Sequence, residues 1–282
     1  MVKRGRTDRL HLRRNVVWGH ATPPPTIAHL TDTSWPTPQH LPPLDGDDIH
    51  VWKASVGALV DHPAPLHASL DAAERARAAG FHHEGDRARF LLSHGLLRVL
   101  ASHYLGRPAA LLAFELGDAG KPYMAGTDQG RLAFNMSHSG DVMLLAFARS
   151  GRVGVDVEHW SDRLGDAEAA RIAASVFSPG EQAALAHLPA GHRQAAFYSV
   201  WTRKEAYLKA TGAGISRGMK HFEVSAHPEA ACLRFDTTLE SGVNRWRLFD
   251  LSPAPRYSAA LASDSSAPRV VTMTIDATMV PP

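Results

Sequence analysis

Apolar and polar residues alternate in ways that predict distinct strands and helices beyond about residue 47. The run DIHVWKA (48–54) alternates as a strand should, and DRARFLLSHGLLRVLASHY (86–104) repeats apolar residues at near-helical intervals. Short strands separated by glycine-bearing turns are expected over 111–158. Helices are expected over about 178–188 and 192–210, followed by strands at RWRLFDL, YSAALAS and VVTMTID. This order favours an α+β fold over a regular βαβ repeat.

Two local signals delimit the folded elements. Residues 21–43 are so rich in proline that neither a helix nor a central strand would persist there. We therefore expect residues 1–46 to be disordered or extended and the folded body to begin near Asp47. In VFSPGEQAALAHL, Ser178 can cap a helix, Pro179 suits its first turn, and Glu181 can reach back to complete a capping box.

The composition excludes several classes of protein. A chain of 282 residues with 44% hydrophobic residues can build a large core, which argues against wholesale disorder and collagen-like repeats. The single cysteine, Cys232, rules out an internal disulfide and fits a reducing compartment. The longest apolar stretch, VMLLAFA (142–148), is far shorter than the roughly 20 residues of a membrane span. We expect a soluble cytoplasmic protein that does not enter a membrane.

Charge is unevenly distributed along the chain. The formal net charge is +2, but residues 1–14 carry six basic side chains and one acidic one, a local +5 that leaves about −3 for the remainder. A folded body of that charge does not suit nucleic-acid binding. The basic tail is typical of a solvated chain end, and we assign it no function.

VGVDVE (153–158) places two acids on one face of a predicted strand. Because strand side chains alternate, Asp156 and Glu158 share a face about 7 Å apart, opposite three valines. Two carboxylates so close repel each other unless a cation lies between them, and their oxygens suit magnesium. The alternative is an amphipathic edge strand whose acidic face is solvated.

FYSVWTRKEAYLKA (197–210) offers a third carboxylate on a predicted helix. Lys204 and Glu205 lie on or beside the apolar stripe that includes Trp201, so both charges need partners. Glu205 could complete a cation site with the two acids of VGVDVE. The alternative is an ordinary ion pair between Glu205 and Lys209, one helical turn apart.

Donors suited to phosphate are grouped at two places. NMSHSG (135–140) is expected to form a turn that presents the Ser137 and Ser139 hydroxyls and the His138 ring, and Lys121 lies between glycine and proline in GKP. A merely exposed polar turn is the alternative. The first long helix is surrounded by basic residues for which a solvated face is the ordinary expectation. They are Arg75, Arg77, Arg87, Arg89 and Arg98.

Several common enzyme classes lack their motifs here. The chain has 17 histidines but neither an H-E-x-x-H sequence nor a cysteine pair, so a zinc site is not expected. A phosphate-binding G-x-x-x-x-G-K-[ST] loop, a G-x-S-x-G elbow and a strand-linked G-x-G-x-x-G are also missing from the sequence. P-loop hydrolases, serine hydrolases and Rossmann enzymes are therefore disfavoured.

The ordered motifs GKP, FNMSHS, VGVDVE, FSPGEQAAL and FYSVWTRKEAYLKATGAGIS resemble those of the surfactin-type 4'-phosphopantetheinyl transferases, in the subtype with tryptophan followed by KEA. The resemblance covers about 47–216. It implies two similar α+β halves in a pseudo-twofold arrangement, 47–152 for binding coenzyme A phosphates and 153–282 for metal binding and catalysis. The active site would lie in the cleft between them.

The resemblance also implies roles for individual residues. Magnesium would be held by Asp156, Glu158 and Glu205. Catalysis would depend on Asp156, Glu205 and Lys209, with Glu205 taking the proton of the acceptor serine. Coenzyme A would be contacted by Arg77, Arg89, Lys121, Pro122, Asn135, Ser137, His138 and Lys209. Phe90 departs from relatives that carry a polar residue there.

The implied reaction moves phosphopantetheine from coenzyme A to a serine of an acyl or peptidyl carrier protein and releases adenosine 3',5'-bisphosphate. We expect the acidic carrier to meet apolar and basic residues near 177–188, and we expect a monomer. Two other classes stay open. A magnesium-dependent phosphohydrolase could use the same acids on a nucleotide, and a non-catalytic module could bind coenzyme A alone.

Overall fold

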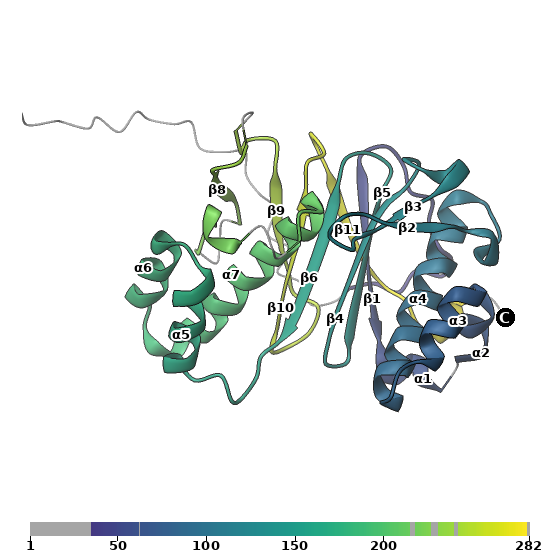
Figure 1. Ribbon diagram of the computed structural model, residues 1–282, viewed down its shortest axis with the longest axis horizontal. Coiled ribbons are helices and arrows are strands. Elements are labelled where there is room, and N and C mark those ends of the chain that lie inside the picture. The colour runs from purple at the N-terminus through teal and green to yellow at the C-terminus, as the bar shows by residue number, and fades with distance from the viewer. Residues whose placement is uncertain (1–34, 62, 215–217, 227–230, 240–241, 281–282) are drawn as a thin grey trace, which may run out of the picture.

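A computed structural model describes residues 35–61, 63–214, 218–226, 231–239 and 242–280. It has two halves, each a sheet covered on its outer face by a long helix, and the two sheets pack between the helices (Figure 1). The predicted α+β fold is thus confirmed. The basic tail and the first part of the proline-rich stretch lie outside the described residues.

The first half has a four-stranded sheet in the order β11-β1-β5-β4. Its strands are β1 (Asp48–Ser55), β4 (Ala133–Ser139), β5 (Val142–Ala148) and β11 (Arg269–Thr274). Its helices are α1 (Val56–Val60), α2 (Pro63–Ser69), α3 (Ala72–Ala79) and the long α4 (Glu84–Leu105). A small hairpin of β2 (Phe114–Leu116) and β3 (Pro122–Met124) projects from it, flanked by 3-10 turns at Ala109–Leu111 and Gly126–Asp128.

The second half has a three-stranded sheet in the order β6-β10-β9. Its strands are β6 (Val153–His159), β9 (Arg247–Leu251) and β10 (Tyr257–Ser263), and its helices are α5 (Asp166–Val176), α6 (Pro179–His187) and α7 (Ala190–Thr211). A second hairpin pairs β7 (Phe222–Val224) with β8 (Leu233–Asp236). Further 3-10 turns span Met219–His221 and Ala277–Met279. The expected capping box at Ser178 and Glu181 begins α6.

The first half is not contiguous along the chain, so the expected assignment of all of 153–282 to the second half needs correction at β11. Strand β11, far into the second half by sequence, returns to pair in parallel with β1 of the first sheet. The folded body also begins earlier than Asp47. Trp35 and Leu44 are buried, and the Trp35 carbonyl accepts a hydrogen bond from the Thr274 hydroxyl at 3.0 Å. Proline prevents regular structure in this segment without preventing it from packing.

The core between the two sheets explains the fully apolar strands. Alternate residues of β1 and β5, such as Val51 and Leu144, pack against Val155 of β6 and Leu261 of β10. The opposite faces pack against α4 in the first half and α7 in the second. Strand β5 is therefore buried on both faces, which accounts for the uninterrupted apolar run VMLLAFA.

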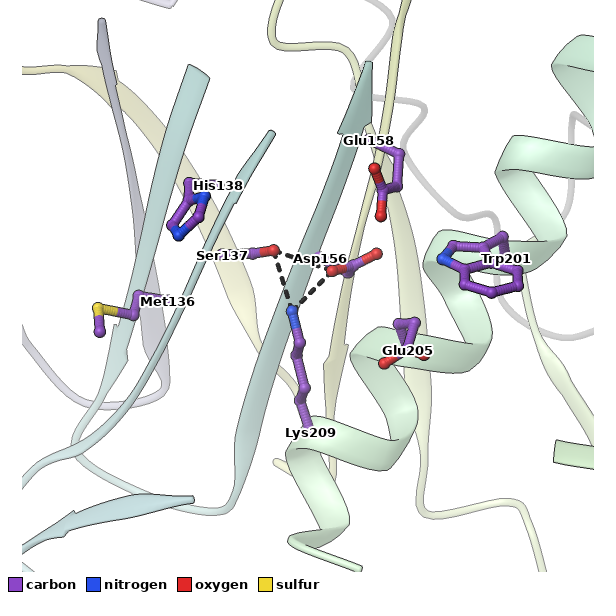
Figure 2. A pocket seen from close by; sticks show the side chains of 8 residues that line it. All are labelled: Met136, Ser137, His138, Asp156, Glu158, Trp201, Glu205 and Lys209. Atoms are coloured by element: carbon purple, nitrogen blue, oxygen red, sulfur yellow. Dashed lines mark hydrogen bonds and ion pairs between the residues drawn. The ribbon is translucent and has the colours of Figure 1, made fainter. Parts of the chain in front are cut away.

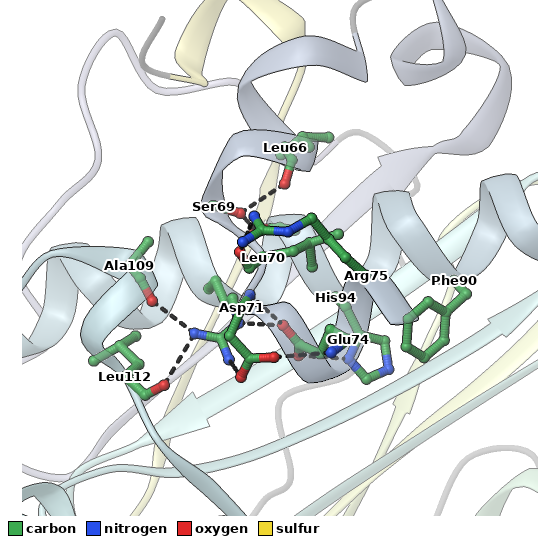
Figure 3. Close-up of polar contacts among 12 residues, drawn as sticks. Leu66, Ser69, Leu70, Asp71, Glu74, Arg75, Phe90, His94, Ala109 and Leu112 are labelled. Atoms are coloured by element: carbon green, nitrogen blue, oxygen red, sulfur yellow. Dashed lines mark hydrogen bonds and ion pairs between the residues drawn. The ribbon is translucent and has the colours of Figure 1, made fainter. Parts of the chain in front are cut away.

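One of the predicted surface arginines is instead a buried structural residue. The Arg98 side chain on α4 is 0% exposed. Its Nε donates to Glu74 at 2.5 Å, and it also pairs with Asp71 and donates to the carbonyls of Ala109 and Leu112. Figure 3 labels these four acceptor residues. The expectation of a solvated face is wrong for this residue, because the buried cation has a full set of acceptors.

Helix α7 lies directly on β6 because glycine occupies the contact. A Cβ added to Gly154 would stand 2.2 Å from the Ala206 carbonyl oxygen and 2.3 Å from the Ala210 amide nitrogen. Any larger residue would push the helix off the strand. This contact sets the distance between the acids of β6 and the polar side chains of α7.

Among the described residues, no helix is long and apolar enough to cross a membrane.

Candidate active site

A pocket opens where β4 of the first half meets β6 and α7 of the second (Figure 2). We call it the acid pocket; its volume is about 380 Å³. It is lined by Met136, Ser137, His138, Asp156, Glu158, Trp201, Glu205 and Lys209. All three predicted acids thus face one cavity although they come from separate elements.

The polar groups from NMSHSG reach this pocket from a strand and not from a turn. Residues 133–139 form β4, and the chain reverses only at Gly140, with φ +55°. The expected turn was wrong by a few residues, because Gly140 at the end of the motif and Asp141 after it suffice for the reversal. The strand's alternation points Ser137 and Ser139 to the same side, toward β6.

A triangle of hydrogen bonds joins the two halves inside the pocket. The Lys209 ammonium donates to Asp156 Oδ1 at 2.6 Å and to the Ser137 hydroxyl at 2.9 Å, and that hydroxyl donates to Asp156 Oδ1 at 2.9 Å (Figure 2). Lys209 therefore pairs with an acid of β6 and not with Glu205, its neighbour on the helix. Asp156 is 3% exposed, so a solvated acidic face does not describe this strand.

Ser139 makes the matching contact to the second acid. Its hydroxyl donates to Glu158 Oε2 at 3.0 Å and accepts a hydrogen bond from the His159 amide at 3.0 Å. Each serine of β4 is therefore opposite one acid of β6. Ser139 was noted in the sequence as a donor but not selected as a site residue. The two-residue spacing that it shares with Ser137, matching that of the acids, was the available signal.

Burial and mutual repulsion raise the pKa of two of the acids. The pKa of Glu205 rises to about 6, first because burial disfavours its charge and second because the Asp156 charge repels it. The pKa of Glu158 also rises, from burial and then from Asp156, with the Ser139 hydrogen bond opposing the change. The nearby ammonium of Lys209 limits both shifts.

His138 lies at the rim of the pocket and is favoured in its neutral form. Partial desolvation lowers its pKa, and the positive charges of Arg89 and Lys209 lower it further. An anion bound between these groups would reverse the electrostatic part of that shift, because it would favour the imidazolium.

The donor set suits a divalent metal ion in one specific respect. Asp156 Oδ2 is buried and has no hydrogen-bond partner in the described part of the chain. A buried carboxylate oxygen without a donor is costly, and a cation would satisfy it. Three carboxylates are also the hard oxygen ligands that magnesium favours. Within the residues described, however, no three acidic, histidine or cysteine side chains already form a compact metal-binding cluster.

The other residues predicted to contact coenzyme A lie in different settings. Asn135 is buried and accepts the Val155 amide at 2.8 Å through Oδ1, which ties β4 to β6. The Lys121 ammonium is directed to backbone carbonyls between the halves, and Pro122 begins β3.

Two predicted phosphate-binding arginines lie on the first half. Arg77, exposed on α3, lies over the Phe90 ring at 5.1 Å, and Arg89 pairs with Asp86 at 2.6 Å. Arg89 is near enough to the pocket for its charge to affect His138. The aromatic residue at position 90 thus supports the Arg77 side chain.

A second, wider hollow adjoins the acid pocket and shares Glu158 and Trp201 with it. This side groove has a volume of about 600 Å³ and lies along α5 and the first turns of α7. Its apolar lining includes Leu164, Ile172 and Phe197. The segment 177–188 offers less apolar surface than expected, since Phe177 and Leu185 point into the core as the capping box orients α6.

Comparison with known proteins agrees with this geometry. The family model for the 4'-phosphopantetheinyl transferase superfamily matches residues 152–262, and the model for the N-terminal part of 4'-phosphopantetheinyl transferases matches 61–150. The chain is 33% identical over 235 residues to the 4'-phosphopantetheinyl transferase HetI of Nostoc, which covers 83% of this chain and 94% of that protein.

Relatives from Bacillus give a similar result over shorter regions. The chain is 31% identical to a 4'-phosphopantetheinyl transferase of Bacillus subtilis, over 56% of this chain and 66% of the relative. It is 34% identical to the transferase psf-1 of Bacillus pumilus, over 53% and 60%. The motifs, the two-halved fold and the near full-length match to HetI together lead to one conclusion: this chain belongs to the 4'-phosphopantetheinyl transferase family.

Proposed function

We propose that the chain transfers the 4'-phosphopantetheine group of coenzyme A to a serine of an acyl or peptidyl carrier protein, and that the transfer takes place in the acid pocket. One observation carries this proposal. Three carboxylates and Lys209, from β6 and α7, face the Ser137 hydroxyl and the His138 ring of β4 across one cavity. Such a cavity has both the cationic and the anionic groups that phosphoryl transfer needs.

The phosphates of coenzyme A would lie on the β4 side of the pocket. The Lys209 ammonium, the Ser137 hydroxyl and His138 are donors that line the pocket there, and Arg89 adds positive charge near the rim. Arg77, which lies over the Phe90 ring, would contact a more peripheral phosphate of the same molecule. Charge-assisted hydrogen bonds of this kind both bind and orient a pyrophosphate.

Asp156, Glu158 and Glu205 would hold magnesium. The partnerless Oδ2 of Asp156 is the observation that favours a cation here. When bound, the ion would neutralise charge on the pyrophosphate and on the leaving group.

Glu205 would accept the proton of the carrier serine. With a pKa of about 6 it is ionised near neutral pH, yet basic enough to take a proton in a buried site. The serine oxygen then bonds to the β-phosphorus of coenzyme A, and the bond from that phosphorus to the bridging oxygen breaks. Lys209 and His138 would stabilise the negative charge on adenosine 3',5'-bisphosphate as it leaves.

The side groove is the proposed approach for the carrier. It leads directly to Glu158 and Trp201 at the edge of the acid pocket, and its apolar residues would meet the apolar surface of a carrier. A monomer is sufficient for this chemistry, since both walls of the pocket come from one chain, and the single cysteine fits a reducing cytoplasm.

The test is mass spectrometry of purified apo-carrier after incubation with the protein, coenzyme A and magnesium. We expect the carrier to gain the mass of one phosphopantetheine group on its serine. Cleavage of coenzyme A or a nucleotide without carrier modification would indicate the phosphohydrolase. Tight coenzyme A binding with neither reaction would indicate a binding module.

A pair of variants sharpens this assay. Glu205→Gln keeps the size of the side chain and removes its charge, so we expect no detectable transfer from a folded protein. Glu115→Gln, on the exposed β2 strand, is the matched control and should transfer normally. Full activity in Glu205→Gln would exclude Glu205 as the base.

A further inference from the structure

The lysine of GKP occupies an unexpected place between the two halves. The Lys121 ammonium donates to the carbonyl of Val153 at 2.9 Å and to the carbonyl of Ala210 at 3.4 Å. Val153 begins β6, the strand of Asp156 and Glu158. Ala210 lies in the last turn of α7, directly after Lys209.

These contacts place a cation where a helix end needs one. The last carbonyls of a helix have no intrahelical donor, and the helix dipole makes that end negative. The Gly212 amide satisfies the carbonyl of Leu208, and Lys121 satisfies that of Ala210. The first half therefore caps the helix that carries Glu205 and Lys209.

The β2–β3 hairpin loop that carries Lys121 packs closely against the C-terminal end of α7. A Cβ at Gly212 would lie 2.4 Å from the Tyr123 hydroxyl, and one at Gly214 would lie 2.7 Å from Ala119 Cβ. Gly120, with φ +79°, turns the chain so that Lys121 can reach across. The GKP loop (120–122) and the TGAG sequence (211–214) at the end of α7 thus pack closely against each other.

We propose that Lys121 is a positioning residue. Its hydrogen bonds hold the start of β6 against the end of α7 and so set the spacing of the acids in the acid pocket. This role rests on the proposed function and replaces the expected phosphate contact. Burial, with a smaller effect from Arg152, lowers the Lys121 pKa to about 8, which accords with an ammonium enclosed between the halves.

The decisive measurement is amide hydrogen exchange of the free protein, compared between wild type and Lys121→Met. Loss of charged hydrogen bonds to two carbonyls should accelerate exchange about tenfold in the last turn of α7 and the first residues of β6. The acceleration should be absent from α4. Lys121→Arg, which keeps the charge and donors, should restore wild-type exchange.

Steady-state kinetics provide a second readout. Lys121→Met removes the hydrogen bonds that join β6 to α7. It should lower kcat several-fold at saturating coenzyme A and magnesium, and should leave KM for coenzyme A within about twofold of wild type. Lys220→Met is the matched control, because Lys220 also donates to a helix carbonyl, that of Ala174 at 2.8 Å, but on the surface of α5. It should change neither readout at the acid pocket.

Two results would overturn the proposal. One is unchanged exchange in Lys121→Met together with a large rise in KM for coenzyme A, which would make Lys121 a phosphate contact. The other is uniform acceleration in every element, which would make it a general stabiliser. If Lys121→Met does not fold, Lys121→Gln, which can donate to one carbonyl, takes its place. Amide hydrogen exchange of the free protein does not depend on transferase activity. A failure of the proposed function would therefore show in the carrier assay and not in the exchange measurement.

Discussion

Two lysines five residues apart on α7 form ion pairs that differ in burial and in how fully their polar groups are hydrogen-bonded. The Lys204 ammonium is 0% exposed and donates to both oxygens of Glu181, at 2.7 and 2.8 Å, and to the Phe222 carbonyl at 2.7 Å. Glu181 in turn accepts the amides of Ser178 and Val224. Every charge of this pair has partners, and the pair joins α6, α7 and β7.

The ion pair of Lys209 with Asp156 is less buried, and its hydrogen-bonding groups are less fully satisfied. Lys209 is 29% exposed, and its partner Asp156 keeps one buried oxygen without a donor in the described residues. The first pair is satisfied within the protein, and the second is satisfied only in part and faces a cavity. The comparison indicates that in the KEAYLK sequence Lys204 holds the helix in place, whereas the partly satisfied Lys209 pair supports the proposed role of Lys209 in ligand binding.

The largest expected effect is on stability, at Lys204. Lys204→Met leaves Glu181 buried and unpaired, and should lower the free energy of unfolding by about 3–5 kcal/mol. Urea denaturation measures this. The double variant Lys204→Met with Glu181→Gln should recover part of the loss, because the buried charge is gone. A loss below that of Lys209→Met would contradict the comparison.

The next effect is on transfer, at the second pair. Lys209→Met and Asp156→Asn should each reduce kcat by about 10²–10³, the usual consequence of removing one group that stabilises transition-state charge. Asp156→Asn should stay close to wild type in stability, because it removes a partly satisfied buried anion. Lys209→Met leaves the buried Asp156 carboxylate with the Ser137 hydroxyl as its donor, so it should lose some stability, but less than Lys204→Met because Lys209 is 29% exposed. Thermal unfolding and carrier modification in the same preparations separate the two effects. A strongly destabilised Asp156→Asn would show that the pair is structural.

The third expectation concerns pH. The pKa of Glu205 is raised from 4.5 to about 6 in the folded protein, so the folded state binds this proton more tightly than the unfolded state does. The stabilisation is complete below about pH 4.5 and is lost as pH rises through about 6. Without metal, wild type should therefore lose stability relative to Glu205→Gln across this interval. Denaturation at several pH values measures the difference, and parallel curves would place the Glu205 pKa near its ordinary value.

The smallest effect is expected at Ser139. Ser139→Ala removes one hydrogen bond to Glu158, worth about 0.5–1.5 kcal/mol, and should raise the magnesium concentration needed for half-maximal transfer by a few-fold. Ser139→Thr keeps the hydroxyl and should retain the wild-type requirement. An unchanged requirement in Ser139→Ala would show that the Glu158 carboxylate needs no support from β4.

Local patterns in the sequence predicted most of the elements correctly. The alternating run at 48–54 is β1, the periodic run at 86–104 is most of α4, and the capping box at Ser178 begins α6. The common face of Asp156 and Glu158 was also predictable, because alternation in a strand depends only on its residues. These features involve neighbours within a few positions, where steric and hydrogen-bonding preferences act directly.

Contacts between distant residues were not readable in the same way. The sequence identified Lys204 as a charge that needs a partner, Lys209 as a possible partner of Glu205 and Lys121 as a possible phosphate donor. The groups that each of them contacts lie on other elements, 23, 53 and 32 or more residues away. The return of β11 to β1 and the packing of Trp35 depend likewise on how the two sheets meet. Amino-acid order specifies which side chains are available and which face they share. Folding of the chain brings their partners within reach, and so decides which lysine holds a helix and which faces the acid pocket.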